Sequence, residues 1–72
     1  DAVIGDHTHI ATGAIVNGDT KIGDRCFIGS GATIANGLKI GDDCVIGSGA
    51  TVIASLASGS LIKSTSVGVT NA

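Results

Sequence analysis

The sequence predicts an all-β fold, a parallel β-helix built from hexapeptide repeats, and three observations support this prediction. Aliphatic residues recur every six positions along most of the chain, and a stronger repeat of 18 residues lies over the first. The apolar fraction of 43% comes almost wholly from Ala, Val, Ile and Leu, with Phe27 as the only aromatic residue. A period of six is not the ~3.6-residue period of an α-helix, and hexapeptide repeats are typical of β-helices.

The six-residue period predicts two columns of side chains that face the interior. The first column is aliphatic at every step: Ile4, Ile10, Val16, Ile22, Ile28, Ile34, Ile40, Ile46 and Val52. The second column follows four residues after each member of the first and is small or apolar: Thr8, Ala14, Thr20, Cys26, Ala32, Leu38, Cys44, Ala50 and Leu56. Such a core consists of small side chains that stack on one another.

The 18-residue period predicts the coils. Ile4-Gly5-Asp6, Ile22-Gly23-Asp24 and Ile40-Gly41-Asp42 are each 18 residues apart, so three hexads make one coil. We predict three triangular coils, each with three short strands and three tight corners, stacked at the ~4.8 Å spacing of paired strands. Glycines at the corners are expected to permit positive φ. Stability should grow as each coil buries its apolar column against the next.

The repeat is expected to end after Leu56, because Ser58 stands where an aliphatic residue is due. We therefore divide the chain into a β-helix over residues 1–57 and a departing C-terminal tail over residues 58–72. Within the tail, Val67 and Val69 are predicted to lie in a short strand.

Composition and charge argue against several classes of function. The net charge is -2, and the four basic residues form no cluster, which argues against binding of nucleic acid. No apolar stretch is long enough to span a bilayer, no signal peptide opens the chain, and two cysteines make no disulfide framework. These features predict a soluble, cytoplasmic protein. Because the chain starts at Asp1 and contains no Met, we expect it to be part of a longer protein.

One corner column is almost bare of side chains. Ala11-Thr12-Gly13, Gly29-Ser30-Gly31 and Gly47-Ser48-Gly49 stack at the 18-residue spacing. A bare column lets an extended ligand approach the backbone amides and carbonyls closely, with three hydroxyl groups available as polar contacts. The alternative interpretation is that glycine and serine merely suit tight corners.

The two histidines flank Thr8, so in an extended segment both side chains point outward on the same side. Either His7 or His9 has the chemistry of a general base, because imidazole titrates near neutral pH. The simpler interpretation is a solvent-exposed histidine without a catalytic role. No third ligand at a suitable spacing supports a zinc site.

Two further columns have structural interpretations. Cys26 and Cys44 are 18 residues apart and stack within reach of a disulfide, yet they occupy the inward column and are expected to act as small buried apolar residues. The ladder of Asp6, Asp24 and Asp42 is expected to hydrogen-bond its own turns rather than to hold a metal.

The Ile-Gly-Asp corners and the phrase Gly5-Asp6-His7-Thr8-His9-Ile10-Ala11-Thr12-Gly13-Ala14 resemble hexapeptide-repeat acyltransferases, in particular sugar O- and N-acetyltransferases of the sialic-acid and bacillosamine type. The resemblance covers about residues 1–61. It implies a left-handed parallel β-helix, an exception to the usual right-handed crossover. It also implies a homotrimer with acetyl-CoA sites between the chains. The implied reaction is transfer of an acetyl group from acetyl-CoA to an amino or hydroxyl group of a sugar or sugar nucleotide.

The resemblance also implies roles for particular residues. In similar enzymes a catalytic His takes a proton from the acceptor, and an acidic residue directly after it raises its basicity. Asp1 matches that acidic position, so the His would fall just before it and is missing from these residues. His9 matches a residue that contacts the acetyl group, and Ser30 and Ser48 match corner positions along the pantetheine arm of acetyl-CoA. These serines coincide with the bare corner column.

Two departures from the resemblance and one alternative remain. The family's Pro-rich C-terminal turn has no counterpart in a chain without proline, and its N-terminal sugar-nucleotide-binding domain is missing. We therefore expect a fragment of such an enzyme. The alternative is a non-catalytic β-solenoid scaffold. Ice binding would need long outward Thr ladders, whereas only Thr33 and Thr51 stack and the position one coil earlier is Ile15.

Overall fold

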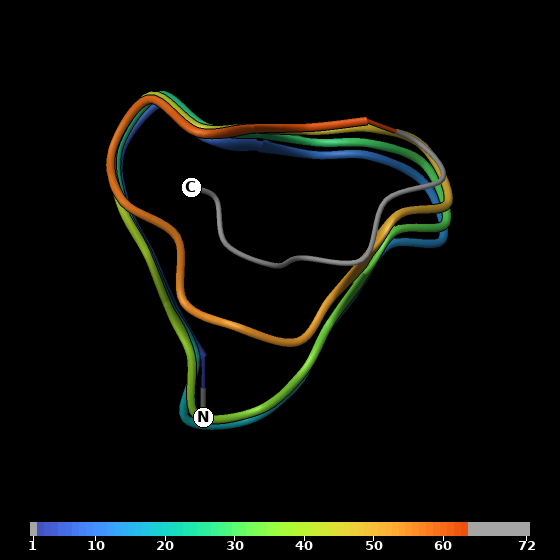
Figure 1. The fold of residues 1–72 in the computed structure, drawn as a ribbon, viewed down its shortest axis with the longest axis horizontal. Coiled ribbons are helices and arrows are strands. Elements are labelled where there is room, and N and C mark those ends of the chain that lie inside the picture. Colours follow the sequence, from blue (N-terminus) through green and yellow to red (C-terminus); the bar gives the residue numbers. More distant parts are fainter. Residues whose placement is uncertain (1, 64–72) are drawn as a thin grey trace.

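Residues 2–63 are the part of the chain that the computed structural model describes, and they form a parallel β-solenoid of about three coils. Ten strands of two residues alternate with turns, and this part of the chain contains no helix (Figure 1). In chain order the strands are β1 (Val3–Ile4), β2 (His9–Ile10), β3 (Ile15–Val16), β4 (Lys21–Ile22), β5 (Phe27–Ile28), β6 (Thr33–Ile34), β7 (Lys39–Ile40), β8 (Val45–Ile46), β9 (Thr51–Val52) and β10 (Leu61–Ile62).

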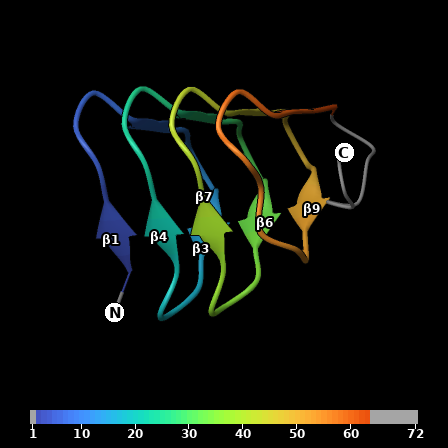
Figure 2. The same cartoon turned by 60° about the vertical axis from the view of Figure 1, so that its left-hand side comes forward.

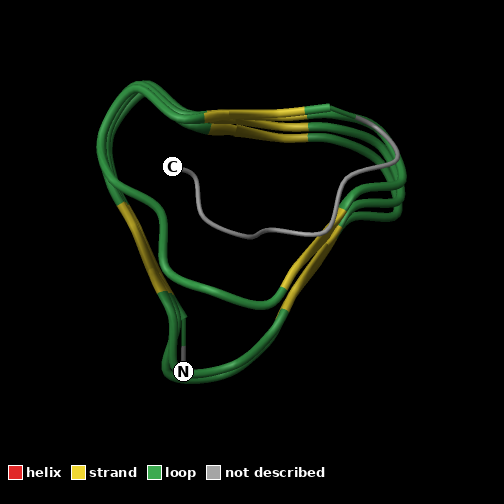
Figure 3. Cartoon of the chain, viewed as in Figure 1, coloured by secondary structure: helices red, strands yellow, loops and turns green. Residues whose placement is uncertain are grey.

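Three parallel sheets form the sides of a triangle (Figure 3). Their strand orders are β1-β4-β7, β10-β8-β5-β2 and β3-β6-β9, so each strand pairs with the strand one coil further on. Through β9 the register joins residues 18 apart, for example Ile10 with Ile28 and Ile34 with Val52. The predicted stack of triangular coils is confirmed.

The helix is left-handed. Seen down its axis, the chain runs clockwise from β1 along the sheet of β2 to the sheet of β3 (Figure 1). Successive coils advance from the N-terminal end, which lies at the back of that view, toward the viewer (Figure 2). Clockwise travel toward the viewer is a left-handed turn, as the resemblance implies.

The core is the stack of both predicted inward columns. Ile28, Ile34 and Ile46 are fully buried, and the second column contributes buried residues between them: Cys26, Ala32, Cys44 and Ala50. The first coil is less covered, because β1 is the edge strand of its sheet. Ile4 is 39% exposed, whereas its partner Ile22 is 3% exposed. This gradient shows that a second coil on each column is what removes it from water.

The three corners are named here in chain order. The first corner comprises residues 5–8, 23–26, 41–44 and 57–60; the second comprises residues 11–14, 29–32 and 47–50; the third comprises residues 17–20 and 35–38. In Figure 1 they lie at the upper left, at the right and at the bottom. None of the described residues forms a helix long and apolar enough to cross a membrane.

Glycine serves the corners in two different ways, and the predicted role accounts for only one. Positive φ occurs at Gly13, Gly31, Gly37, Gly49 and Gly59, as expected. At the first corner, however, the positive φ falls on His7, Arg25 and Asp43, at 57–58°. The preceding glycines instead allow the next coil to approach: a methyl group on Gly41 would lie 2.5 Å from the amide nitrogen of Ser58. The expectation of positive φ is therefore wrong for Gly5, Gly23, Gly29 and Gly41.

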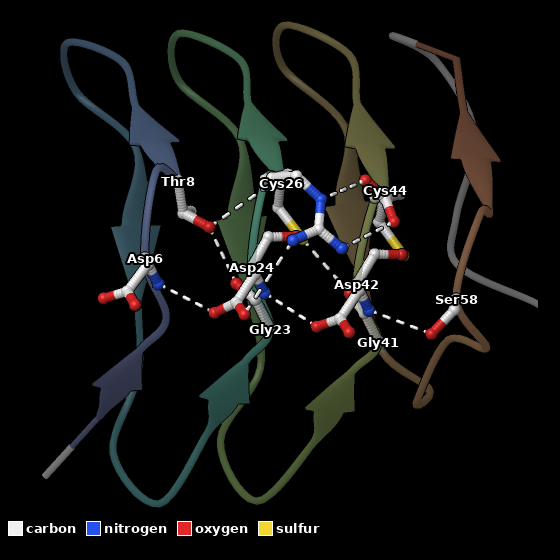
Figure 4. Close-up of polar contacts among 11 residues, drawn as sticks. Asp6, Thr8, Gly23, Asp24, Cys26, Gly41, Asp42, Cys44 and Ser58 are labelled. Atoms are coloured by element: carbon white, nitrogen blue, oxygen red, sulfur yellow. Dashed lines mark hydrogen bonds and ion pairs between the residues drawn. The ribbon is translucent and has the colours of Figure 1, made fainter.

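Small polar side chains of the second inward column tie successive coils together at the first corner (Figure 4). The Thr8 hydroxyl donates to the carbonyl of Gly23 at 2.7 Å. The thiols of Cys26 and Cys44 donate in the same way to the next coil, to the carbonyls of Gly41 at 3.1 Å and Ala57 at 3.3 Å. Each side chain is thus small enough for the core and also satisfies a backbone acceptor.

The last coil is two residues shorter than the others. Leu56 bridges Ile40, and Leu61–Ile62 pairs with Val45–Ile46, so the spacing falls from 18 to 16. In Figure 1 the orange trace accordingly turns inside the third corner. The coil continues to Ile62, past the predicted boundary at residue 57, while residues 64–72 of the predicted tail, with Val67 and Val69, lie outside the described residues.

This shorter coil changes two sequence assignments. Leu56 belongs to the first, aliphatic column and not to the second, because it pairs with Ile40. Ser58 takes the place of an aspartate rather than of an aliphatic residue, and its hydroxyl accepts a hydrogen bond from the amide of Asp42 at 3.0 Å.

Candidate functional site

The second corner carries the bare column that the sequence predicts. Thr12, Ser30 and Ser48 are the first residues of its three turns, and all three are exposed. Backbone hydrogen bonds hold the turns in line: the amide of Gly31 donates to Thr12 at 3.1 Å, and the amide of Gly49 donates to Ser30 at 2.9 Å. Three hydroxyl-bearing residues therefore form one continuous exposed column along the axis of the solenoid.

The outer surface of this corner is open. A methyl group placed on Gly31 would meet no other heavy atom within 4 Å, and one on Gly13 would meet only the backbone of Gly31, at 3.8 Å or more. Gly29, by contrast, is buried against the next coil. The corner is thus tightly packed inside and bare outside, which is the geometry that lets a ligand reach backbone groups.

His9 lies on the same sheet, just ahead of the second corner. It is the first residue of β2, three residues before Thr12, and it is exposed. Its imidazole stacks on the ring of Phe27, with centroids 5.2 Å apart and the planes at 6°. The sequence analysis missed this partner, although the 18-residue spacing of His9 and Phe27 was a signal for it.

His7 does not share this site. Its φ of 57° makes it the second residue of a turn at the first corner, so the segment from His7 to His9 is not extended as predicted. Asp1, the other residue to which the resemblance gives a catalytic role, lies outside the described residues.

The strongest local charge interaction is at the first corner. Arg25 donates from Nε and Nη2 to the two carboxylate oxygens of Asp43, at 2.8 and 3.1 Å. This hydrogen-bonded pair raises the pKa of Arg25 and lowers the pKa of Asp43. Both side chains are exposed, and the pair joins adjacent coils at a corner that does not carry the bare column. The 18-residue spacing was again a signal that the sequence analysis did not use.

The cysteines are structural. Cys26 and Cys44 are free thiols and are buried, as predicted. Burial raises the pKa of the Cys26 thiol, which disfavours the nucleophilic thiolate. A role for Cys26 as a reacting nucleophile is therefore disfavoured by its surroundings.

The aspartate ladder links coils instead of closing its own turns, which corrects the predicted bonding. Asp24 Oδ1 accepts from the amide of Asp6 at 2.8 Å, and Asp42 Oδ1 accepts from the amide of Asp24 at 2.7 Å (Figure 4). Residues 2–63 contain no group of three or more side chains of His, Cys, Asp or Glu arranged to hold a metal ion.

Fold and repeat together define a hexapeptide-repeat β-helix protein. The family model for the bacterial transferase hexapeptide (six repeats) matches residues 1–36 and 19–54, and the chain belongs to this family. Proteins of the family are typically acyltransferases, generally use acyl-CoA and commonly form trimers. No curated protein and no solved structure matches the chain.

Proposed function

We propose that this chain forms the donor-binding part of an acetyltransferase that moves an acetyl group from acetyl-CoA to an amino or hydroxyl group of a sugar or sugar nucleotide. The chain would act as a homotrimer. In this proposal the pantetheine arm lies along the second corner, over Ser30 and Ser48, and the acetyl group lies beside His9. The resemblance gives Asp1 the role of orienting the histidine that acts as general base.

The observation that carries the proposal is the exposed, bare column of the second corner with an exposed imidazole at its N-terminal end. Membership of an acyltransferase family supplies the class of ligand. An extended arm needs a long, shallow surface with scattered polar contacts, and Thr12 to Ser48 spans two coil spacings, or ~10 Å. Because Gly31 and Gly13 leave space around these hydroxyls, backbone groups are available to the ligand as well.

The proposed chemistry is acyl transfer. The acceptor nitrogen or oxygen attacks the thioester carbonyl carbon, its proton passes to the general base, and the carbon–sulfur bond breaks to release the coenzyme A thiolate. Negative charge develops on the carbonyl oxygen in the transition state. An N–H of the His9 imidazole is suited to donate a hydrogen bond to that oxygen, which would stabilise the transition state.

The binding site is tested by blocking the column with a large side chain. Ser30→Trp and Ser48→Trp are each expected to weaken the binding of acetyl-CoA at least about tenfold, a loss of about 1.4 kcal/mol. Calorimetric titration with acetyl-CoA measures this change. Asn36→Trp is the matched control, because Asn36 is the first residue of the equivalent turn at the third corner and is also exposed.

The serine variants separate this proposal from its alternative. Unchanged affinity in both Ser30→Trp and Ser48→Trp would exclude the second corner as the donor site. A wild-type chain that folds but has no measurable affinity for acetyl-CoA would favour a non-catalytic β-solenoid scaffold instead.

A further inference from the structure

We propose that Phe27 is a positioning residue that holds the imidazole of His9 beside the acyl group of the donor. This inference rests on the proposed function and adds a residue to it. It starts from the stacked pair of rings on the outer face of the sheet of β2, β5, β8 and β10.

The position of β2 leaves His9 with a single cross-strand neighbour. In the order β10-β8-β5-β2, the strand β2 is at the edge, so the described chain places a strand on only one side of it. The register pairs His9 with Phe27. No hydrogen bond between the imidazole and another described residue accompanies the stack. Its orientation therefore depends on its own rotamer preference and on the ring of Phe27.

The geometry of the stack leaves the imidazole nitrogens available. Parallel rings touch through their faces, while both nitrogens of the imidazole lie at the edge of its ring. With the planes only 6° apart, neither N–H points at the face of Phe27. The stack thus restricts the tilt of the imidazole without occupying the N–H that the proposed chemistry needs.

Phe27 contributes little to the core by comparison. Its side chain is 44% exposed and lies outside the solenoid, whereas the inward residue of the same strand, Ile28, is fully buried. The next outward residue in the column, Val45, offers an apolar surface but no ring. A flat ring at position 27 consequently serves the neighbour at position 9 more than it serves the core.

The test compares two ligands that differ only in the acetyl group. The affinity ratio of acetyl-CoA to coenzyme A, measured by calorimetry on the wild-type chain, reports contacts to that group. Phe27→Leu should lower this ratio about two- to tenfold, the range of measured aromatic-pair energies. Phe27→Tyr should restore the ratio, because it keeps the ring. Val45→Leu is the control, since it changes the same column one coil away from the stack.

A spectroscopic measurement shows whether the stack itself is present. In proton NMR spectra the carbon-bound ring protons of His9 should move downfield in Phe27→Leu, where the ring current of Phe27 is lost, and stay in place in Phe27→Tyr and Val45→Leu. Unmoved His9 signals in Phe27→Leu would overturn the inference. So would a ratio that falls in His9→Ala and stays at the wild-type value in Phe27→Leu. If His9→Ala itself leaves the ratio unchanged, the proposed role of His9 and this inference are both wrong.

Discussion

At the scale of single residues, the corners show that one residue type satisfies two unrelated constraints. Gly37 is needed for its backbone conformation, with φ at 77° and open space where a side chain would be. Gly29 has no such φ, but a methyl group there would lie 2.5 Å from the amide nitrogen of Ser48. Both look alike in the sequence, because each is simply a glycine at a corner. The two constraints respond differently to substitution.

This difference leads to a paired stability prediction. Gly29→Ala is expected to lower the free energy of unfolding by about 1–3 kcal/mol, because the coils must separate locally to admit the methyl group. Gly37→Asn is expected to cost less than about 1 kcal/mol, because asparagine tolerates positive φ and the site is open. Urea denaturation of both variants measures the difference. Equal losses would contradict the assignment of two kinds of glycine.

The residue scale is also where prediction from sequence was weakest. The spacing of 18 places Asp24 next to Asp6, but an aspartate at a corner has two amides within reach, one in its own turn and one in the preceding coil. Local sequence does not distinguish them, and the solenoid uses the second. The ring stack of His9 and Phe27 has the same origin. Spacing brings the two side chains together, but their side-chain torsions decide how the rings meet.

At the scale of strands and coils, prediction succeeded for as long as the period was constant. From Ile4 to Val52 every aliphatic position is inward, and the register follows from counting. The loss of two residues in the last coil then shifts the phase. Leu56 fits the second column when counted in sixes from Val52, and fits the first column when paired with Ile40. Only the pairing in three dimensions decides between these positions.

The shortened coil predicts an unusual order of tolerance at position 58. Ser58→Asp should keep the acceptor for the amide of Asp42, as Asp24 and Asp42 do for the coils before them, and leave the stability nearly unchanged. Ser58→Ile should remove that acceptor and cost about 1 kcal/mol. Thermal unfolding of the two variants tests this. If Ser58→Ile were the more stable variant, the original assignment of an aliphatic position would be correct after all.

At the scale of the whole molecule, the outer faces carry more apolar surface than the core requires. Val3, Ile15, Val45 and Leu61 are between 42% and 63% exposed. They belong to the outward columns of three different sheets. Exposed apolar side chains in such number are typical of surfaces that contact other chains. This favours the proposed trimer, the assembly that is common in the family.

The proposed trimer gives a prediction about mass. Sedimentation equilibrium at micromolar concentration should yield a mass three times that of the single chain. The melting temperature should rise with protein concentration, because association stabilises the folded state by mass action. A monomer mass with a melting temperature independent of concentration would rule out the trimer for this chain and, with it, a donor site formed between chains.

The constant spacing of paired strands also governs how the chain is able to fold. Nearly every strand contact joins residues 18 apart, so each added coil closes a loop of the same length and meets the same entropic cost. No contact joins the two ends of the molecule early, and none has to wait for a distant segment to arrive. Folding is thus expected to resemble the closing of a zipper: it starts at any pair of adjacent coils and spreads toward both ends.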